Sequence, residues 1–142
     1  MNASEMFVIP MGIYVLYVIC FFIYSFFCRV NAIKAGELSP FYYKDYQNKP
    51  EVPQKLIILE RHMDHQFQVP TVFLVTGAVL LSMQVVSMVS VYLAWGFVIS
   101  RFIHTYIHLG QNKILWRAGV YAIGGIMILS MWGQLFYQVL SR

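Results

Sequence analysis

One polar stripe lies at the front of an apolar segment of this 142-residue chain. Arg61, His65 and Gln68 stand at positions i, i+4 and i+7, so a helix would place them on one face, with Asp64 beside them. Guanidinium groups suit carboxylates, phosphates and thiolates because they present several N–H donors in a fixed plane. The stripe is therefore a candidate for binding an anion.

A second stripe lies at the end of another apolar segment. Arg101, His104 and His108 stand at i, i+3 and i+7, again on one helical face, and Gly110 marks the expected helix end. Arg117 follows in the first turn or so of the next apolar segment. Ionisable side chains within a membrane span are costly, so they usually face the bundle interior or a wet cavity. The two stripes together form a candidate site.

The charges near the stripes do not balance. Asp64, even with Glu60, leaves an excess of positive charge beside Arg61, Arg101 and Arg117. An unpaired buried charge is costly, so the missing partner is expected to be an anion. Asp64 is expected to be the counter-ion of Arg101. In the simpler alternative, Arg61 reaches the lipid headgroups and Asp64 with Arg101 only holds two helices together.

A metal site is the other alternative. His104 and His108 form an H-x-x-x-H pair, to which Asp64 and His65 could add ligands. Neighbouring arginines repel a cation, and no glutamate stands among the histidines as a base. A haem held by two histidines is disfavoured by the same charges. The sequence therefore predicts no metal site.

The elements that must position these residues follow from the composition. The chain is 59% hydrophobic and 11% charged, whereas soluble domains have about 25% charged residues. No charged residue occurs in 6–28, 69–100 or 118–141. A helix crosses a bilayer with about 20 apolar residues, so the middle stretch must end one span and begin the next. We predict an all-α fold, a membrane-spanning four-helix bundle forming one integral membrane domain over 1–142, with transmembrane helices at about 6–30, 54–81, 88–109 and 115–140.

The basic residues predict the orientation of these spans. The first loop and its flanks hold Arg29, Lys34, Lys44, Lys49 and Lys55, and the last loop holds Lys113 with Arg117 just beyond. The positive-inside rule places both loops in the cytoplasm and both termini on the non-cytoplasmic side. The net charge of +4 is explained by this topology, and no nucleic-acid-binding motif is present. Both stripes then fall in one layer facing the cytoplasm.

At these two stripes the sequence resembles MAPEG, the membrane-associated proteins in eicosanoid and glutathione metabolism, and most of all the branch found in bacteria. The family pattern R-x-x-x-N-x-x-E-x-P-x-x-F stands here as Arg61, His65, Gln68, Pro70 and Phe73. The pattern R-x-x-H-x-x-x-[YH]…N-x-x-x-x-R stands as Arg101, His104, His108, Asn112 and Arg117. The resemblance covers the chain from about Glu51 to its end, while the first helix matches only in character.

The resemblance implies a homotrimer of four-helix protomers in a bacterial inner membrane, with glutathione between protomers near the cytoplasmic face. It implies a glutathione-dependent transferase or peroxidase acting on hydrophobic electrophiles that partition into the bilayer. An arginine at the position of Arg117 would stabilise the thiolate and is the expected catalytic residue. The expected ligand-binding residues are Arg61, Asp64, His65, Gln68, Arg101, His104, His108 and Asn112.

Two departures from the pattern bear on the ligand. His65 replaces the family Asn, and Gln68 replaces the family Glu. Without that Glu the layer is more cationic, which can favour a different anion. The family also includes a non-enzymatic, lipid-presenting member, and fold alone does not settle activity. The alternative is a non-catalytic trimeric membrane protein that binds an anionic or amphipathic lipid.

Overall fold

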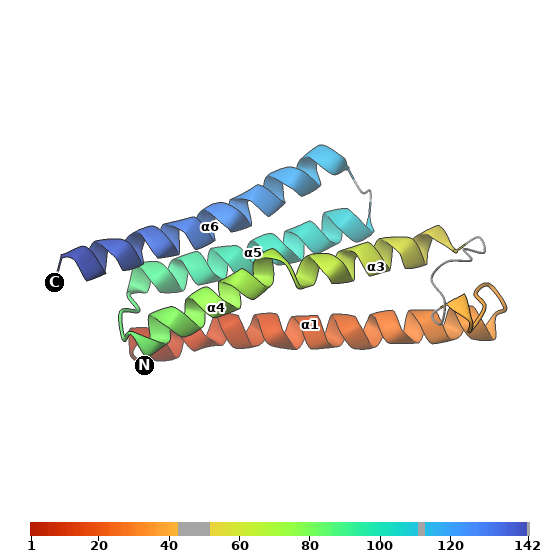
Figure 1. Cartoon of the computed structure of the whole chain (residues 1–142), viewed down its shortest axis with the longest axis horizontal. Helices are drawn as coiled ribbons and strands as arrows, with labels where there is room; N and C mark the ends of the chain where they lie inside the picture. The colour runs from red at the N-terminus through yellow and green to blue at the C-terminus, as the bar shows by residue number, and fades with distance from the viewer. Residues whose placement is uncertain (43–51, 111–112, 142) are drawn as a thin grey trace.

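The computed structural model describes residues 1–42, 52–110 and 113–141, and within them it contains helices and no strand. The helices are α1 (Ala3–Lys34), α3 (Gln54–Gln66), α4 (Val69–Ser82), α5 (Met88–Leu109) and α6 (Ile114–Leu140). α3 and α4 lie end to end and run antiparallel to α1 and α5, and α6 runs back along α5 (Figure 1). Both termini lie at one end of the bundle (Figure 1). The all-α fold predicted from composition is confirmed.

The second expected span is not one continuous helix. α1, α5 and α6 are each long and apolar enough to cross a membrane, but the segment 54–81 is divided into α3 and α4 at Phe67 and Gln68. Pro70 explains the break, because it has no N–H to donate to the carbonyl of Gln66 and its ring clashes with that carbonyl in a continuous helix. The break leaves Gln68 between the two helices, with its side chain exposed.

Local sequence fixes the ends of α1 and α5. The Asn2 side chain accepts a hydrogen bond from the Glu5 N–H (2.8 Å), and the Glu5 carboxylate accepts one from the Asn2 N–H (3.0 Å). This capping box begins α1 a few residues before the predicted start at 6. Ser87 and Ser90 form the equivalent box at the start of α5. Gly110 caps the end of α5, as its position in the sequence predicts.

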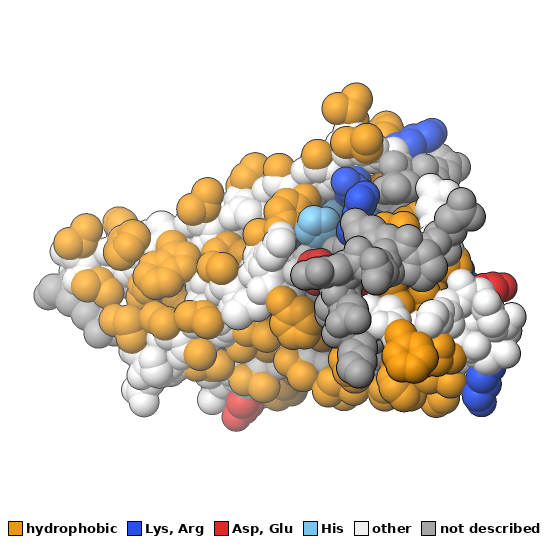
Figure 2. Space-filling model, turned by 45° about the vertical axis from the view of Figure 1, so that its right-hand side comes forward, with side chains coloured by type: hydrophobic (Ala, Val, Ile, Leu, Met, Phe, Trp, Pro, Cys, Tyr) orange, Lys and Arg blue, Asp and Glu red, His pale blue; other side chains and the backbone are white. Residues whose placement is uncertain are grey.

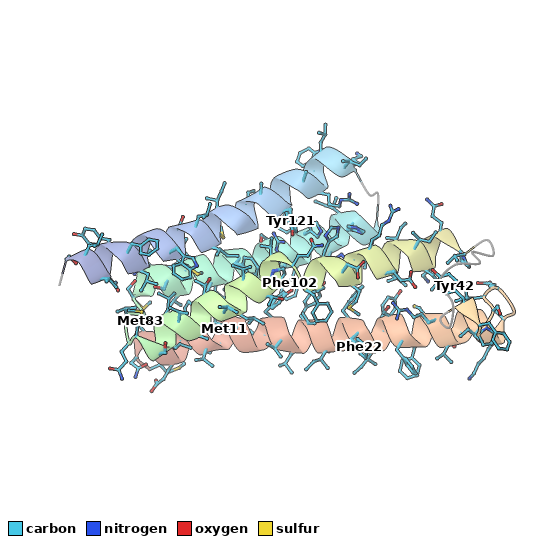
Figure 3. The ribbon with its side chains drawn as sticks, viewed as in Figure 1. Met11, Phe22, Tyr42, Met83, Phe102 and Tyr121 are labelled. Atoms are coloured by element: carbon cyan, nitrogen blue, oxygen red, sulfur yellow. The ribbon has the colours of Figure 1, made fainter. Side chains whose placement is uncertain are left out.

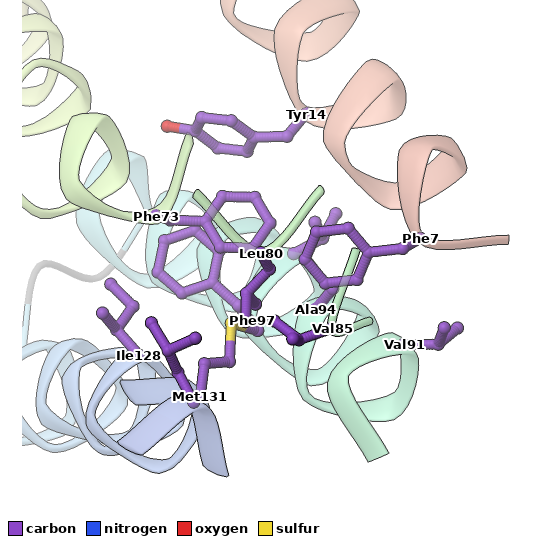
Figure 4. Packing of buried hydrophobic residues seen from close by; sticks show 12 residues of the cluster. Phe7, Tyr14, Phe73, Leu80, Val85, Val91, Ala94, Phe97, Ile128 and Met131 are labelled. Carbon is purple, nitrogen blue, oxygen red and sulfur yellow. The ribbon is translucent and has the colours of Figure 1, made fainter. Parts of the chain in front are cut away.

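The apolar core lies between α1, α4, α5 and α6 (Figure 4). Phe73 and Phe97 stack with ring centroids 4.2 Å apart, and Tyr14 meets both rings edge-on at 6.2 and 6.0 Å. Ile128 and Met131 bring α6 into the same cluster. Fully burying a side chain of this size contributes about 1.5–3 kcal/mol. The core therefore fixes α4, α5 and α6 relative to one another next to the polar layer.

Apolar side chains also cover the outside of the bundle (Figure 2). The outward side of α6 exposes 60% of Ile126, 71% of Leu129 and 74% of Tyr137. Soluble monomers rarely expose apolar patches of this extent. With three helices long enough to span a bilayer, this surface identifies an integral membrane protein.

Candidate functional site: a cationic pocket between α3, α5 and α6

A pocket of about 280 Å³ lies between α3, α5 and α6, beside Gln68 at the α3–α4 junction. The ribbons of α5 and α6 diverge in this half of the bundle (Figure 1). The lining residues of the pocket are His65, Gln68, His104, Arg117, Ala118, Tyr121 and Ala122. Tyr121 lies in the space between α5 and α6 (Figure 3). The pocket lies in the half of the bundle opposite the two termini, and Figure 2 shows basic and histidine side chains side by side on one face there.

The two polar stripes meet at this pocket. The His65 ring centroid lies 6.0 Å from that of His104 and 5.7 Å from that of His108. His62 stacks on His104 at 5.8 Å, with an angle of 20° between the rings. All four histidines of the chain thus form one cluster. The packing of α3 on α5 brings them together.

Hydrogen bonds orient the polar wall of the pocket. The Tyr121 hydroxyl donates to Gln68 Oε1 (3.4 Å), and His65 Nδ1 lies 3.3 Å from the same oxygen. His104 Nδ1 lies 3.3 Å from the carbonyl oxygen of Arg117. Because both acceptors are carbonyl oxygens, the Nδ1 atom of each histidine carries the proton. These contacts fix the tautomers of His65 and His104, and the second one links the Arg117 backbone to α5.

Arg101 does not line the pocket but lies behind Tyr121. Its side chain is 2% exposed. Nη2 donates to the carbonyl oxygens of Val120 (3.1 Å) and Tyr121 (3.2 Å), and the guanidinium carbon lies 5.0 Å from the ring centroids of Phe97 and Tyr121. The α6 backbone is accessible here because Gly124 carries no side chain to cover it. Arg101 is therefore held by dipoles and aromatic faces rather than by a carboxylate.

The expected ion pair between Asp64 and Arg101 is wrong within this chain. Asp64 is exposed on the outer face of α3, while Arg101 points inward to α6, and no ion pair joins them. An ion pair that the structure does contain joins Arg29 and Glu60, with 4.0 Å between Nη2 and Oε1. The position of Asp64 in the sequence does not indicate where the Arg101 side chain points. That side chain turns to α6 because Gly124 leaves the carbonyl oxygens of Val120 and Tyr121 uncovered.

Other expected ligand-binding residues lie outside the pocket lining. Arg61 is exposed on α3, one turn before His65. His108 is 1% exposed and lies behind His65 and His104, and neither of its ring nitrogens has a hydrogen-bond partner in the described part of the chain. Asn112 lies outside the described residues. No group of three or more His, Cys, Asp or Glu side chains is placed to hold a metal ion within 1–42, 52–110 and 113–141.

Two features were missed by reasoning from the sequence. Tyr121 was not selected, although it follows Arg117 by four residues and so shares its helical face. His62 was also not selected. Its Nε2 atom lies 2.7 Å from Gln66 Nε2, 3.1 Å from Thr105 Oγ1 and 3.2 Å from the Tyr17 hydroxyl. The spacing of His62 and Gln66 by four residues could have indicated this second, inward stripe on α3.

The protein has an apolar helical bundle and a cationic pocket at one end of it. These features place it among integral membrane proteins with a candidate site for an anion. The MAPEG family model matches residues 7–137, nearly the whole chain, and the protein belongs to the MAPEG family. The match confirms the resemblance drawn from the two stripes and extends it into α1. No curated protein and no solved structure matches the chain.

Proposed function

We propose that the protein is a glutathione-dependent transferase or peroxidase that acts on hydrophobic electrophiles from the bilayer. The observation that carries the proposal is the pocket itself, in which Arg117, His65, His104 and Gln68 converge. Membership of a family that includes such enzymes supports it. Exposed apolar side chains on α6 near the lining residues, such as Leu115 and Ile123, support access from the bilayer.

The chemistry requires a thiolate, because the thiolate and not the thiol is the nucleophile. A guanidinium close to sulfur, partly shielded from water, favours the ionised form. Two observations support this role for Arg117: it lines the pocket wall, and its backbone carbonyl oxygen accepts a hydrogen bond from His104. In a transferase the sulfur lone pair forms a C–S bond, and the leaving group departs with the electrons of the bond it breaks. In a peroxidase the same sulfur forms an S–O bond to the terminal oxygen of a hydroperoxide as the O–O bond breaks, and the other oxygen leaves as an alcohol after protonation. A second glutathione thiol then displaces water from the sulfenic acid and gives the disulfide.

The test is binding of glutathione to the purified protein in detergent, followed by ultraviolet absorbance near the thiolate band. We expect thiolate absorbance that is proportional to bound glutathione at neutral pH, where the free thiol is mostly protonated. Binding without thiolate absorbance would contradict the proposal. It would favour the second candidate, a non-catalytic protein that binds an anionic or amphipathic lipid. That candidate is motivated by His65 and Gln68, which replace the family Asn and Glu.

We also propose that the pocket is completed between protomers of a homotrimer. Ala118 and Ala122 of the lining are exposed on α6. Gly119, between them in sequence, has open space around it, and small residues let a second membrane helix approach closely. We expect native mass spectrometry in several mild detergents to show a trimer. A persistent monomer or dimer across all of them would contradict this assembly.

For membrane placement we propose that both termini lie on the non-cytoplasmic side of a bacterial inner membrane, with α3 and α4 together making the second passage. The basis is the concentration of Lys and Arg at the end of the bundle opposite the termini. Single-cysteine variants at Asn2 and Ser141, with Cys20 and Cys28 replaced by Ala, should be labelled in intact spheroplasts. Lys113→Cys should be labelled only after the membrane is opened. The reverse pattern would contradict the orientation.

A further inference from the structure

The polar atoms that the pocket offers to a ligand are mainly hydrogen-bond donors. Gln68 Oε1 already faces two donors, the Tyr121 hydroxyl at 3.4 Å and His65 Nδ1 at 3.3 Å. The remaining polar group of this side chain is the Nε2 amide, which carries two hydrogens and accepts none. No hydrogen bond to Nε2 occurs among the described residues. Gln68 is exposed at the pocket wall, so it presents a donor at the position where the family pattern has a carboxylate.

The electrostatic environment of the pocket is also positive. No acidic residue is present in the lining that the structure describes, and Asp64 lies on the exposed face of α3 outside it. Behind the Tyr121 ring, the Arg101 guanidinium donates to the neutral oxygen atoms of Ser100, Val120 and Tyr121. No carboxylate within 1–42, 52–110 and 113–141 pairs with it, and its field adds to that of Arg117 in a region of low dielectric constant. A cation placed in this pocket would be repelled and would meet no carboxylate among the described lining residues.

Glutathione carries two carboxylates, a thiol and one ammonium group. The carboxylates and the thiolate match the donors and the charge of the pocket, whereas the ammonium has to lose hydration without gaining a partner. Resting on the proposed function, we propose that the site selects thiols by their anionic groups and does not recognise an ammonium. The ligand class is anionic thiols, with or without a free amine, and Gln68 is the residue that sets this specificity.

The experiment compares glutathione with its N-acetyl derivative, which keeps the thiol and both carboxylates and lacks the ammonium. The full-length protein in detergent is titrated with each compound by calorimetry. We expect the wild type to bind the N-acetyl compound at least as tightly as glutathione. In Gln68→Glu the new carboxylate can pair with the ammonium, so glutathione should bind about tenfold more tightly than the N-acetyl compound. Gln68→Met, which adds no charge, should retain the wild-type ratio.

The inference is overturned if acetylation weakens binding to the wild type by about tenfold, or if Gln68→Glu leaves the ratio unchanged while its thermal unfolding matches that of the wild type. The S-methyl forms of both compounds separate this inference from the proposed function. Equal binding of the two S-methyl forms, with no thiolate absorbance from glutathione, would overturn the enzyme and support the anion selectivity. If glutathione gives thiolate absorbance and its N-acetyl derivative gives none, the enzyme would be supported and the anion selectivity overturned. Failure of all four compounds to bind would overturn both.

Discussion

Replacing Arg117 by Leu should abolish the thiolate absorbance of bound glutathione and reduce conjugation by about 10²–10³-fold, the usual loss when one preorganised stabiliser of a developing anion is removed. The physical reason is that the pocket would lose the cation that favours the ionised sulfur. Glutathione affinity should fall much less, because the carboxylates retain His65, Gln68 and the field of Arg101. The measurement is difference absorbance at saturating glutathione, together with kcat and Kd.

Two further variants separate a role in chemistry from a role in folding. Arg117→Lys keeps a positive charge and should retain part of the thiolate signal. Lys113→Leu removes an exposed cation that lines a different hollow and should leave both the signal and conjugation unchanged. Equal thiolate formation by the wild type and by Arg117→Leu would show that Arg117 only anchors α6 at the lipid headgroups.

Gly124→Ala should destabilise the protein by about 2–4 kcal/mol, because it displaces a buried charge from its hydrogen-bond acceptors. A Cβ at this position would overlap the Arg101 guanidinium, with its Cζ at 2.9 Å, and would lie 3.1 Å from Ser100 Oγ. The guanidinium would have to leave the carbonyls of Val120 and Tyr121. Thermal unfolding in detergent measures the effect.

Gly125→Ala is the matched control on the same helix. No atom lies within 4 Å of a Cβ built at Gly125, and alanine favours a helix over glycine by about 0.5–1 kcal/mol. This variant should be as stable as the wild type or slightly more so. In an Arg101→Met background, Gly124→Ala should cost much less than in the wild type, since the neighbour that it displaces is no longer a charge. Equal stability of the Gly124→Ala and Gly125→Ala variants would contradict the role assigned to Arg101.

Reasoning from the sequence worked where the information is local or periodic. Helical spacing placed Arg61 and His65 on one face of α3, whereas Gln68 lies beyond the end of that helix. Charge-free runs gave the all-α fold and the approximate helices. The second span was predicted as one helix over about 54–81, and the structure divides it into two helices at Phe67 and Gln68. The motif in the third helix, with Arg101 and its neighbours, was specific enough to identify the family that the comparison confirms.

The failures concern direction and partner choice across helices. Asp64 and Arg101 have opposite charges, but Asp64 is exposed on α3 whereas Arg101 is buried and bonded to α6 carbonyl oxygens. The packing of each helix sets the rotation of its stripe. Nothing in the sequence distinguishes Tyr121 and Gly124 from the other residues of the apolar segment 118–141. Only when α6 packs on α5 does Tyr121 become a pocket wall and Gly124 a gap for a guanidinium.

By itself, the sequence determined that this chain is a helical membrane protein of the MAPEG type with a cationic layer near one end, because composition, period and motif spacing are properties of the chain alone. The tertiary structure decided which side chains of that layer share a pocket. It turned Arg101 inward to the α6 backbone, left Arg61 and Asp64 on the exposed side of α3, and placed His65, His104 and Arg117 together. The rotation of each helix about its own axis depends on how the helices pack, and no local pattern fixes it.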